Sequence, residues 1–225
     1  MKRFVICILA LTVFAAVAAN AIPAWPYVEY SDSIGLSTTN WNSSVSLPKF
    51  DTSLGTLQYI EFFLGGHVEG TAKFESKDAA PATVTMNLQA NIMLMRPDST
   101  ILLVTIPFAL TVDNVPEWDG ADDYLGPSGR TYEGLSGNKQ ESTTSSTPAD
   151  LALFSGSGSI ILPVSALGTS YGSGAGNLLL QFSTSASADA KVRYYYEPVP
   201  EPSSLIALFT GLTGIAGLVG SRRKR

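Results

Sequence analysis

Acidic side chains gather in one short stretch of the chain, where oxygen ligands at close spacing could hold a calcium ion. The segment around them contains several glycine residues. Ca²⁺ takes about six to eight oxygen ligands, but this spacing does not match an EF-hand loop. Acidic residues in an exposed loop are also commonly just solvated. Calcium is therefore one of two interpretations, and the sequence predicts no other cofactor or metal. The acidic residues are Asp113, Glu117, Asp119, Asp122 and Asp123.

Aromatic residues lie close to these acids and suggest a second kind of ligand. Trp118, Tyr124 and Tyr132 could stack on sugar rings, which would make the loop 114–132 a carbohydrate-binding site. Alternatively, the same rings pin a long loop onto the body of the protein. Two of the carboxylates could serve as a glycosidase pair only if their separation were fixed. A mobile loop does not fix it, and no catalytic residue is predicted there.

Two other patterns resemble catalytic or metal-binding motifs. Gly168-Thr169-Ser170-Tyr171-Gly172 has the letters of a nucleophile elbow. That elbow requires a strand before it, a helix after it and a histidine later in the chain. The only histidine is His67, about a hundred residues earlier, and one histidine cannot form a zinc site. The elbow letters are therefore a coincidence of composition, and the chain is not expected to be an enzyme.

The elements that would carry these residues are β-strands, because apolar and polar residues alternate along the central part of the chain. In 67–75, 83–94 and 189–196 every second residue is apolar, which is the period of a half-buried strand. No comparable stretch repeats at helical spacing. Further strands are expected at 57–64, 101–112, 158–162 and 177–187.

The turns between these strands indicate the fold class. Gly65-Gly66 is predicted to form a tight hairpin turn, and Arg96-Pro97-Asp98-Ser99 a second turn. About seven or eight short strands separated by turns are typical of an antiparallel sandwich. We therefore predict an all-β, jelly-roll-like single domain over residues 22–197, with no strand order implied.

Irregular segments interrupt the pattern in three places. Residues 114–150 are rich in glycine, proline and polar residues, and their tail 137–148 is expected to be mobile. Residues 165–176 are predicted to be a second flexible connection. Near the start of the domain, Phe50 and Leu54 are expected to fill the core from a turn that enters a strand.

The N-terminal residues have the organisation of a secretory signal peptide. Lys2 and Arg3 precede an apolar run that ends at Ala19-Asn20-Ala21, a small-x-small site for signal peptidase. Cleavage is predicted after Ala21, with cleavage after Ala19 as the alternative. The only cysteine, Cys7, lies in the removed segment, so the mature protein would have no thiol and no disulfide.

The C-terminal residues form three consecutive parts. A short motif is followed by an apolar run at 205–220, which would measure about 24 Å as a helix. A basic tail then keeps this end on the cytoplasmic side of a membrane. Together the parts would hold an exported chain in the membrane. The motif is Val199-Pro200-Glu201-Pro202-Ser203, and the tail is Arg222-Arg223-Lys224-Arg225.

This combination resembles a PEP-CTERM sorting signal, here residues 198–225. The resemblance implies recognition by an exosortase, removal of the helix, and delivery to the cell surface or the extracellular matrix of a biofilm. An ordinary C-terminal transmembrane anchor with accidental PEP letters is the alternative.

The body has a resemblance of its own, to choice-of-anchor domains of the E type. Residues 46–57 read SLPKFDTSLGTL, which is similar to the start of those domains, and the Leu162-Pro163-Val164 and Gly176-Asn177 steps agree with later positions. The resemblance implies an extracellular β-rich domain and no known activity.

The net negative charge of the body bears on which partners it can bind. Outside the signal peptide and the basic tail, eight basic residues face nineteen acidic ones. Such an anionic chain is not suited to nucleic acid, whose phosphates require Lys and Arg. The expected partners are signal peptidase, an exosortase, the membrane during export, and an exopolysaccharide.

Overall fold

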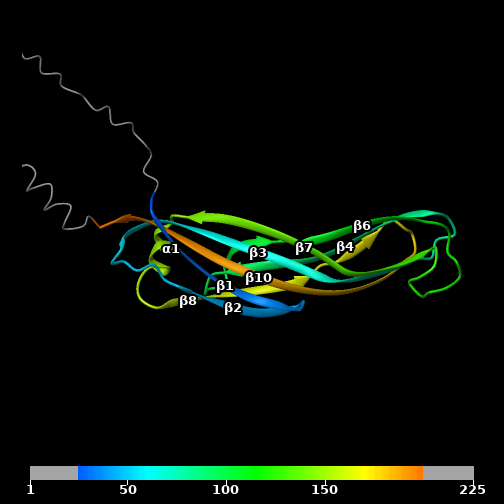
Figure 1. Cartoon of the computed structure of the whole chain (residues 1–225), viewed down its shortest axis with the longest axis horizontal. Helices are drawn as coiled ribbons and strands as arrows, with labels where there is room; N and C mark the ends of the chain where they lie inside the picture. The colour runs from blue at the N-terminus through cyan, green and yellow to red at the C-terminus, as the bar shows by residue number, and fades with distance from the viewer. Residues whose placement is uncertain (1–24, 200–225) are drawn as a thin grey trace, which may run out of the picture.

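The computed structural model describes residues 25–199, and these residues form two antiparallel β-sheets packed face to face. The predicted signal peptide, the helix at 205–220, the basic tail and all of the PEP motif except Val199 lie outside this part of the chain. In the described part, no helix is long and apolar enough to cross a membrane. Both ends of the described chain lie at the same end of an elongated body, near α1 (Pro148–Leu153) (Figure 1).

The two sheets differ in their strand orders. The first sheet, called sheet A here, has the order β1 (Tyr27–Thr38), β10 (Leu178–Pro198), β3 (Gly55–Ser76) and β7 (Gly129–Ser145). The second, sheet B, has the order β2 (Trp41–Pro48), β8 (Ser159–Gly168), β4 (Ala82–Met95) and β5 (Ile101–Thr105). Two further strands, β6 (Phe108–Val115) and β9 (Tyr171–Ser173), also pair with β4. Most connections between successive strands cross from one sheet to the other.

The core lies between the sheets and is built by strict alternation along the long strands. On β4, Val84, Met86, Leu88, Ala90, Ile92 and Leu94 are all buried. The facing strand β3 contributes Ile60, Phe62, Leu64 and Val68, and β10 contributes a row of alanines that ends at Val192 and Tyr194. The all-β prediction is confirmed, as are the strands at 67–75, 83–94 and 189–196.

Several predicted boundaries are wrong in detail. The strands at 177–187 and 189–196 are one continuous strand, β10. The strand at 101–112 is divided into β5 and β6 around Pro107, which cannot donate a ladder hydrogen bond. The predicted turn at Arg96–Ser99 is confirmed, with the Ser99 amide donating to the Arg96 carbonyl at 2.9 Å.

The hairpin turn predicted at Gly65-Gly66 is wrong, because both glycines lie inside β3. Gly66 pairs with Ala188 on one side and with Lys139 on the other. A Cβ on Gly66 would lie 2.8 Å from Thr105 Cγ2, so this glycine is required by the close approach of the two sheets. A turn is not the reason for it.

Two segments expected to be mobile are strands. The tail 137–148 lies mostly in β7, whose Gly137–Ser145 portion pairs residue by residue with β3. Its serines and threonines occupy an edge strand, which backbone hydrogen bonds to β3 hold in place. Because an edge strand is half exposed, it accepts a segment with few apolar side chains. Residues 165–176 likewise contain the end of β8 and all of β9.

The N-terminal part of the domain contains two strands that were not predicted, β1 and β2. Phe50 follows β2 and is fully buried as predicted, with its ring 5.3 Å from that of Tyr196 and 6.0 Å from that of Tyr194. Leu54 was expected beside it in the core, but its side chain is 37% exposed. Leu54 lies in the turn after Asp51, where its amide donates to the Asp51 carbonyl, so its side chain points away from the sandwich.

Candidate functional site on the outer face of sheet A

The acidic residues considered as calcium ligands lie at the end of the body opposite α1, and four of the five have separate hydrogen-bond partners. Asp113, on β6, accepts a hydrogen bond from the Tyr132 hydroxyl at 2.5 Å. Asp122 accepts one from Lys77 Nζ at 2.8 Å. Burial and the Asp113 carboxylate raise the pKa of Tyr132, which keeps that hydroxyl a donor.

The remaining residues of this loop stabilise its turns. Asp119 Oδ1 accepts the Ala121 amide at 3.0 Å, and Asp123 Oδ1 accepts the Leu125 amide at 2.8 Å. Trp118 donates to the Ala121 carbonyl and has Lys77 Nζ 5.2 Å from its ring centroid. Glu117 is exposed. Within residues 25–199, no three His, Cys, Asp or Glu side chains form a group that could hold a metal ion.

The nucleophile-elbow letters run from the last residue of β8, Gly168, to Gly172 in β9. Ser170 Oγ accepts the Gln89 amide at 3.0 Å and lies 3.0 Å from Thr184 Oγ1. The segment that follows is a strand, so the strand–turn–helix context of an elbow is not formed. His67 lies in the middle of β3 on another face of the molecule.

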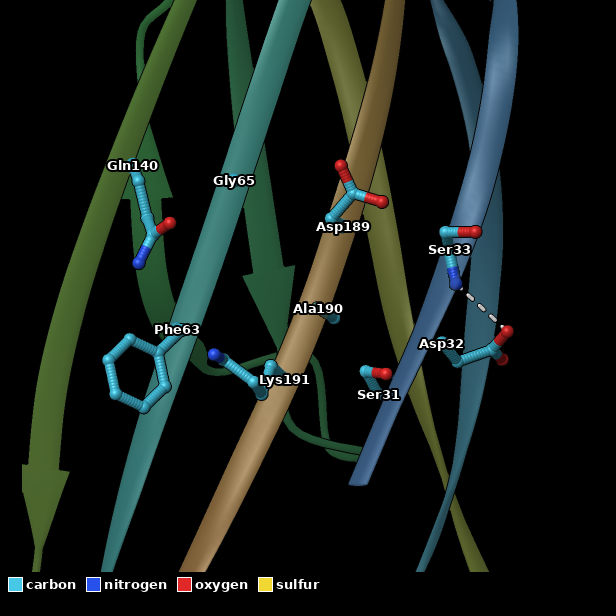
Figure 2. A pocket seen from close by; sticks show the side chains of 9 residues that line it. All are labelled: Ser31, Asp32, Ser33, Phe63, Gly65, Gln140, Asp189, Ala190 and Lys191. Carbon is cyan, nitrogen blue, oxygen red and sulfur yellow. Dashed lines mark hydrogen bonds between the residues drawn. The ribbon is translucent and has the colours of Figure 1, made fainter. Parts of the chain in front are cut away.

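A depression of about 480 Å³ lies on the outer face of sheet A, about midway along its strands. A neighbouring depression of about 300 Å³ shares Gly65, Gln140 and Asp189 with it. We call the two together the Gly65 groove. Its centre is one row across the four strands: Ser33 of β1, Asp189 of β10, Gly65 of β3 and Gln140 of β7 (Figure 2).

Rows on either side of the central one complete the groove. On the side toward α1, Ser31, Lys191 and Phe63 lie next to one another across β1, β10 and β3. On the opposite side, His67 Nδ1 lies 2.8 Å from Asn138 Oδ1. The Gly65 groove is therefore bordered by an aromatic ring at one end and by an imidazole–amide pair at the other.

Gly65 creates the depression, and the fold itself does not require a glycine there. A Cβ at this position would have only ordinary contacts, the nearest being Asp189 Cβ at 3.5 Å. Its backbone is not in the left-handed region that favours glycine. Glycine inside a strand lowers stability, and it often marks a place where a ligand or another backbone approaches closely.

Alanine at the two adjacent glycines is expected to have opposite effects. Gly65→Ala should leave the free energy of unfolding unchanged or raise it by up to about 1 kcal/mol, because it removes backbone freedom from the unfolded chain. Gly66→Ala should lower it by about 1–3 kcal/mol, because the new methyl group overlaps Thr105 and Ile92. Urea unfolding of both variants measures the difference. Equal destabilisation by the two would show that Gly65 is needed for packing.

The polar groups beside Gly65 have no protein partners. Asp189 and Gln140 are exposed, and neither side chain makes a hydrogen bond or an ion pair with any described residue. By contrast, the nearby charged groups are paired: Arg193 Nε lies 2.6 Å from Glu29 Oε2, and Lys191 Nζ lies 3.5 Å from the same atom. Hydrogen bonding from Arg193 lowers the pKa of Glu29.

Aromatic rings extend the Gly65 groove toward α1. In Figure 2 the Phe63 ring lies flat beside β3, with its face toward the viewer. Lys191 Nζ and the Arg193 guanidinium each lie 4.8 Å from its centroid. Farther along, the rings of Tyr59 and Tyr195 stack at 4.3 Å, and the Tyr195 hydroxyl donates to Glu61 at 3.0 Å.

This arrangement can bind a hydroxyl-rich ring. A carboxylate and an amide on both sides of a bare backbone offer acceptors and donors to adjacent hydroxyl groups. Strand β3 lies between β10 and β7, so the backbones that carry Asp189 and Gln140 are about 10 Å apart. This distance leaves room for one sugar ring above Gly65. The half-buried ring of Phe63, which Lys191 and Arg193 also approach, lies next to it and offers an apolar edge.

The sequence contained a signal for this site that the strand assignment concealed. The interpretation of Gly65 as part of a turn divided β3 into two predicted strands. Without a continuous β3 between them, nothing in the sequence indicated that Asp189 and Gln140 lie in one row. A continuous strand through 55–76 would have placed an outward glycine between Phe63 and His67. The Gln140 side of the groove could not have been found, because β7 was expected to be mobile.

No protein-family model matches this chain, and no curated protein matches it. Among solved structures, the chain matches "Structure of infectious bursal disease virus Gt strain" at 15% identity over 94% of this chain and 55% of that one, with a TM-score of 0.13. It also matches "Crystal structure of infectious bursal disease virus VP2 subviral particle" at 12% identity over 92% and 53%, with a TM-score of 0.19. The chain spans about half the length of these structures. TM-scores this low support no conclusion about fold or function.

Proposed function

We propose that this chain is a non-enzymatic, exported protein of the cell surface or extracellular matrix that binds a matrix polysaccharide on the outer face of sheet A. The observation that carries the binding proposal is the pair of unpartnered polar side chains, Asp189 and Gln140, on either side of a glycine that the fold does not require. The loop 114–132 is the weaker candidate, because three of its four acidic side chains, and Asp113 just before it, are held by protein partners.

The proposed route to the surface rests on the two ends of the sequence. A signal peptide at 1–21 would export the chain, and an exosortase would recognise the motif at 199–203 before removing the helix at 205–220. The described body is compatible with this route, because its two ends lie at the same end of the sandwich (Figure 1), where the Tyr196 amide donates to the Pro26 carbonyl at 3.1 Å.

A jelly roll is the fold that we propose within the all-β class. Its support is the strand orders β1-β10-β3-β7 and β2-β8-β4-β5, in which sequence neighbours mostly lie in opposite sheets. Greek-key connections of this kind define the jelly roll.

Replacing Pro200, Glu201 and Pro202 together with alanine is expected to keep the protein in the inner membrane. The replacements remove the conformational restriction that the prolines impose and the one carboxylate between them. Fractionation and mass spectrometry of the mature C-terminus in the native host measure the effect. A triple alanine change at 42–44, three exposed residues of β2, is the control for general export defects. Surface delivery and processing of the motif variant at the normal level would contradict the sorting proposal.

A further inference from the structure

The two sheets of the body differ sharply in charge. The four strands of sheet A contain fourteen Asp, Glu, Lys and Arg residues. The six strands of sheet B contain one, Asp113, and its carboxylate is bonded to Tyr132. The outer face of sheet B therefore lacks the charged residues that normally keep an exposed sheet from associating.

Large apolar side chains are exposed on this uncharged face. Phe108, Leu110 and Val112 occupy alternate positions of β6 and are 53%, 54% and 59% exposed. On the other side of β4, Leu167 is 50% and Tyr171 49% exposed. Exposed apolar rows of this kind are typical of a protein–protein interface.

A column of uncharged polar residues on β4 separates the two apolar rows. The strand register places Asn87 between Leu110 and Tyr171. Asn87 Oδ1, Asn91 Oδ1 and Ser165 Oγ are already buried and have no hydrogen-bond partner among the described residues. Because these polar atoms are already removed from water, covering the face would cost little further desolvation.

We propose that the outer face of sheet B binds the same face of a second copy of this chain. Residues 25–199 carry eight basic and eighteen acidic side chains, so two bodies repel each other, and they repel least when they meet through an uncharged surface. Sheet B is that surface. Apolar rows flank its polar column on both sides of β4, and a two-fold interface would bring this same patch of the two copies together.

Other occupants fit this face less well. A charged partner would find no complementary charge on sheet B. A membrane surface is usually approached with Lys and Arg beside the apolar residues, and this face has none. In the paired arrangement both copies of sheet A face outward, so the two Gly65 grooves would be presented on opposite sides; the pairing itself does not depend on the proposed function.

Replacing both Leu110 and Val112 with glutamate in the full chain tests the proposal. Sedimentation in mild detergent should show concentration-dependent dimers for the unchanged protein, and a dimer dissociation constant at least about tenfold higher for the variant. Ser142→Glu with Thr144→Glu is the matched control: it adds the same charge at alternate positions of an exposed edge strand, in sheet A, and should not change the dissociation constant. Raising the salt concentration should strengthen the dimer, because it screens the repulsion between anionic bodies.

Cross-linking provides a second measurement that does not depend on the double variant. In a chain with Cys7 replaced by serine, a single Val112→Cys change should give a disulfide-linked dimer on mild oxidation, and Thr144→Cys should not. A protein that is monomeric at all concentrations would overturn the proposal, as would dimers unaffected by the Leu110 and Val112 changes. Binding to phosphatidylcholine vesicles that is lost in the same variant would also overturn it, in favour of a membrane.

Discussion

Replacing Arg96 with methionine is expected to lower the free energy of unfolding by about 3 kcal/mol. Arg96 Nε and Nη2 donate to the two oxygens of Asp150 at 2.7 and 2.8 Å. Asp150 is 3% exposed, and the substitution would leave its carboxylate buried with only Ser145 Oγ as a side-chain donor. The Arg96 side chain is 26% exposed, so the expected loss lies at the lower end of the range for buried pairs.

This pair holds α1 across one end of the sandwich. Asp150 is in the first turn of α1, and its amide donates to the Thr147 cap at 3.3 Å. Phe154, directly after the helix, is fully buried with its ring 5.0 Å from that of Phe62. A loosened α1 would therefore expose one end of the main core.

Thermal unfolding measures the effect, with an expected decrease in Tm of about 6–12 °C for a body of this size. Lys139→Met is the control, because the Lys139–Glu141 pair has both side chains more than 40% exposed and should contribute about 0.5 kcal/mol or less. An Arg96→Met variant as stable as this control would show that the pair does not hold the end of the sandwich.

The same ion pair predicts how stability depends on pH. Hydrogen bonds from Arg96 lower the pKa of Asp150 below its ordinary value, despite the opposing effect of burial. The unfolded chain therefore binds a proton at Asp150 at a higher pH than the folded protein does. The contribution of the ionised Asp150 to the free energy of unfolding is fully present above the pKa of about 3.9 that this group has in the unfolded chain. It is lost as the pH falls through the lower pKa that Asp150 has in the folded protein. Urea unfolding between about pH 5 and pH 2 should show the free energy of unfolding falling with pH, and Asp150→Asn should reduce that fall.

Replacing Gly65 with phenylalanine is expected to abolish saccharide binding and leave the fold intact. The side chain would point outward from β3 into the depression and occupy the space between Asp189 and Gln140. No backbone strain opposes the change, because a Cβ at Gly65 has only ordinary contacts. Calorimetry with oligosaccharides released from the host's own exopolysaccharide measures the loss, and an unchanged Tm shows that the body is still folded.

Asp189→Asn separates chemistry from shape at the same position. The amide has the size of the carboxylate but loses the charge-assisted hydrogen bonds, so affinity should fall by about 10- to 100-fold. Glu133→Gln, on exposed β7 outside the groove, is the matched control for the loss of one negative charge. Equal affinities for the Asp189 and Glu133 variants would remove Asp189 from the site.

The sequence predicted the class of fold because the inner strands alternate without exception. Val84 to Leu94 and Val68 to Phe74 each place every second side chain in the core, and a period of two has no helical explanation. The edge strands were harder to predict. Strand β7 is rich in serine, threonine and glycine, and its position depends on hydrogen bonds to β3, a partner distant in sequence.

Glycine in the middle of a strand was the principal source of error. Gly65-Gly66 has the letters of a tight turn, but one glycine is required by the opposite sheet and the other leaves the outer face open. Both reasons depend on residues more than twenty positions away, so no local pattern could have distinguished them from a turn. The acidic loop had the opposite problem: its composition suggested a shared site, but its side chains bond to separate neighbours.

The most direct test of the account is to locate the bound saccharide on the protein. In ¹⁵N-labelled full-length chain, titration with the exopolysaccharide fragments should shift the amide resonances of Gly65, Gln140 and Asp189 and their neighbours across sheet A. Those of 117–123 and of sheet B should stay in place. Shifts confined to the 117–123 loop, or no shifts at concentrations that saturate the intact matrix, would contradict a binding site at the Gly65 groove.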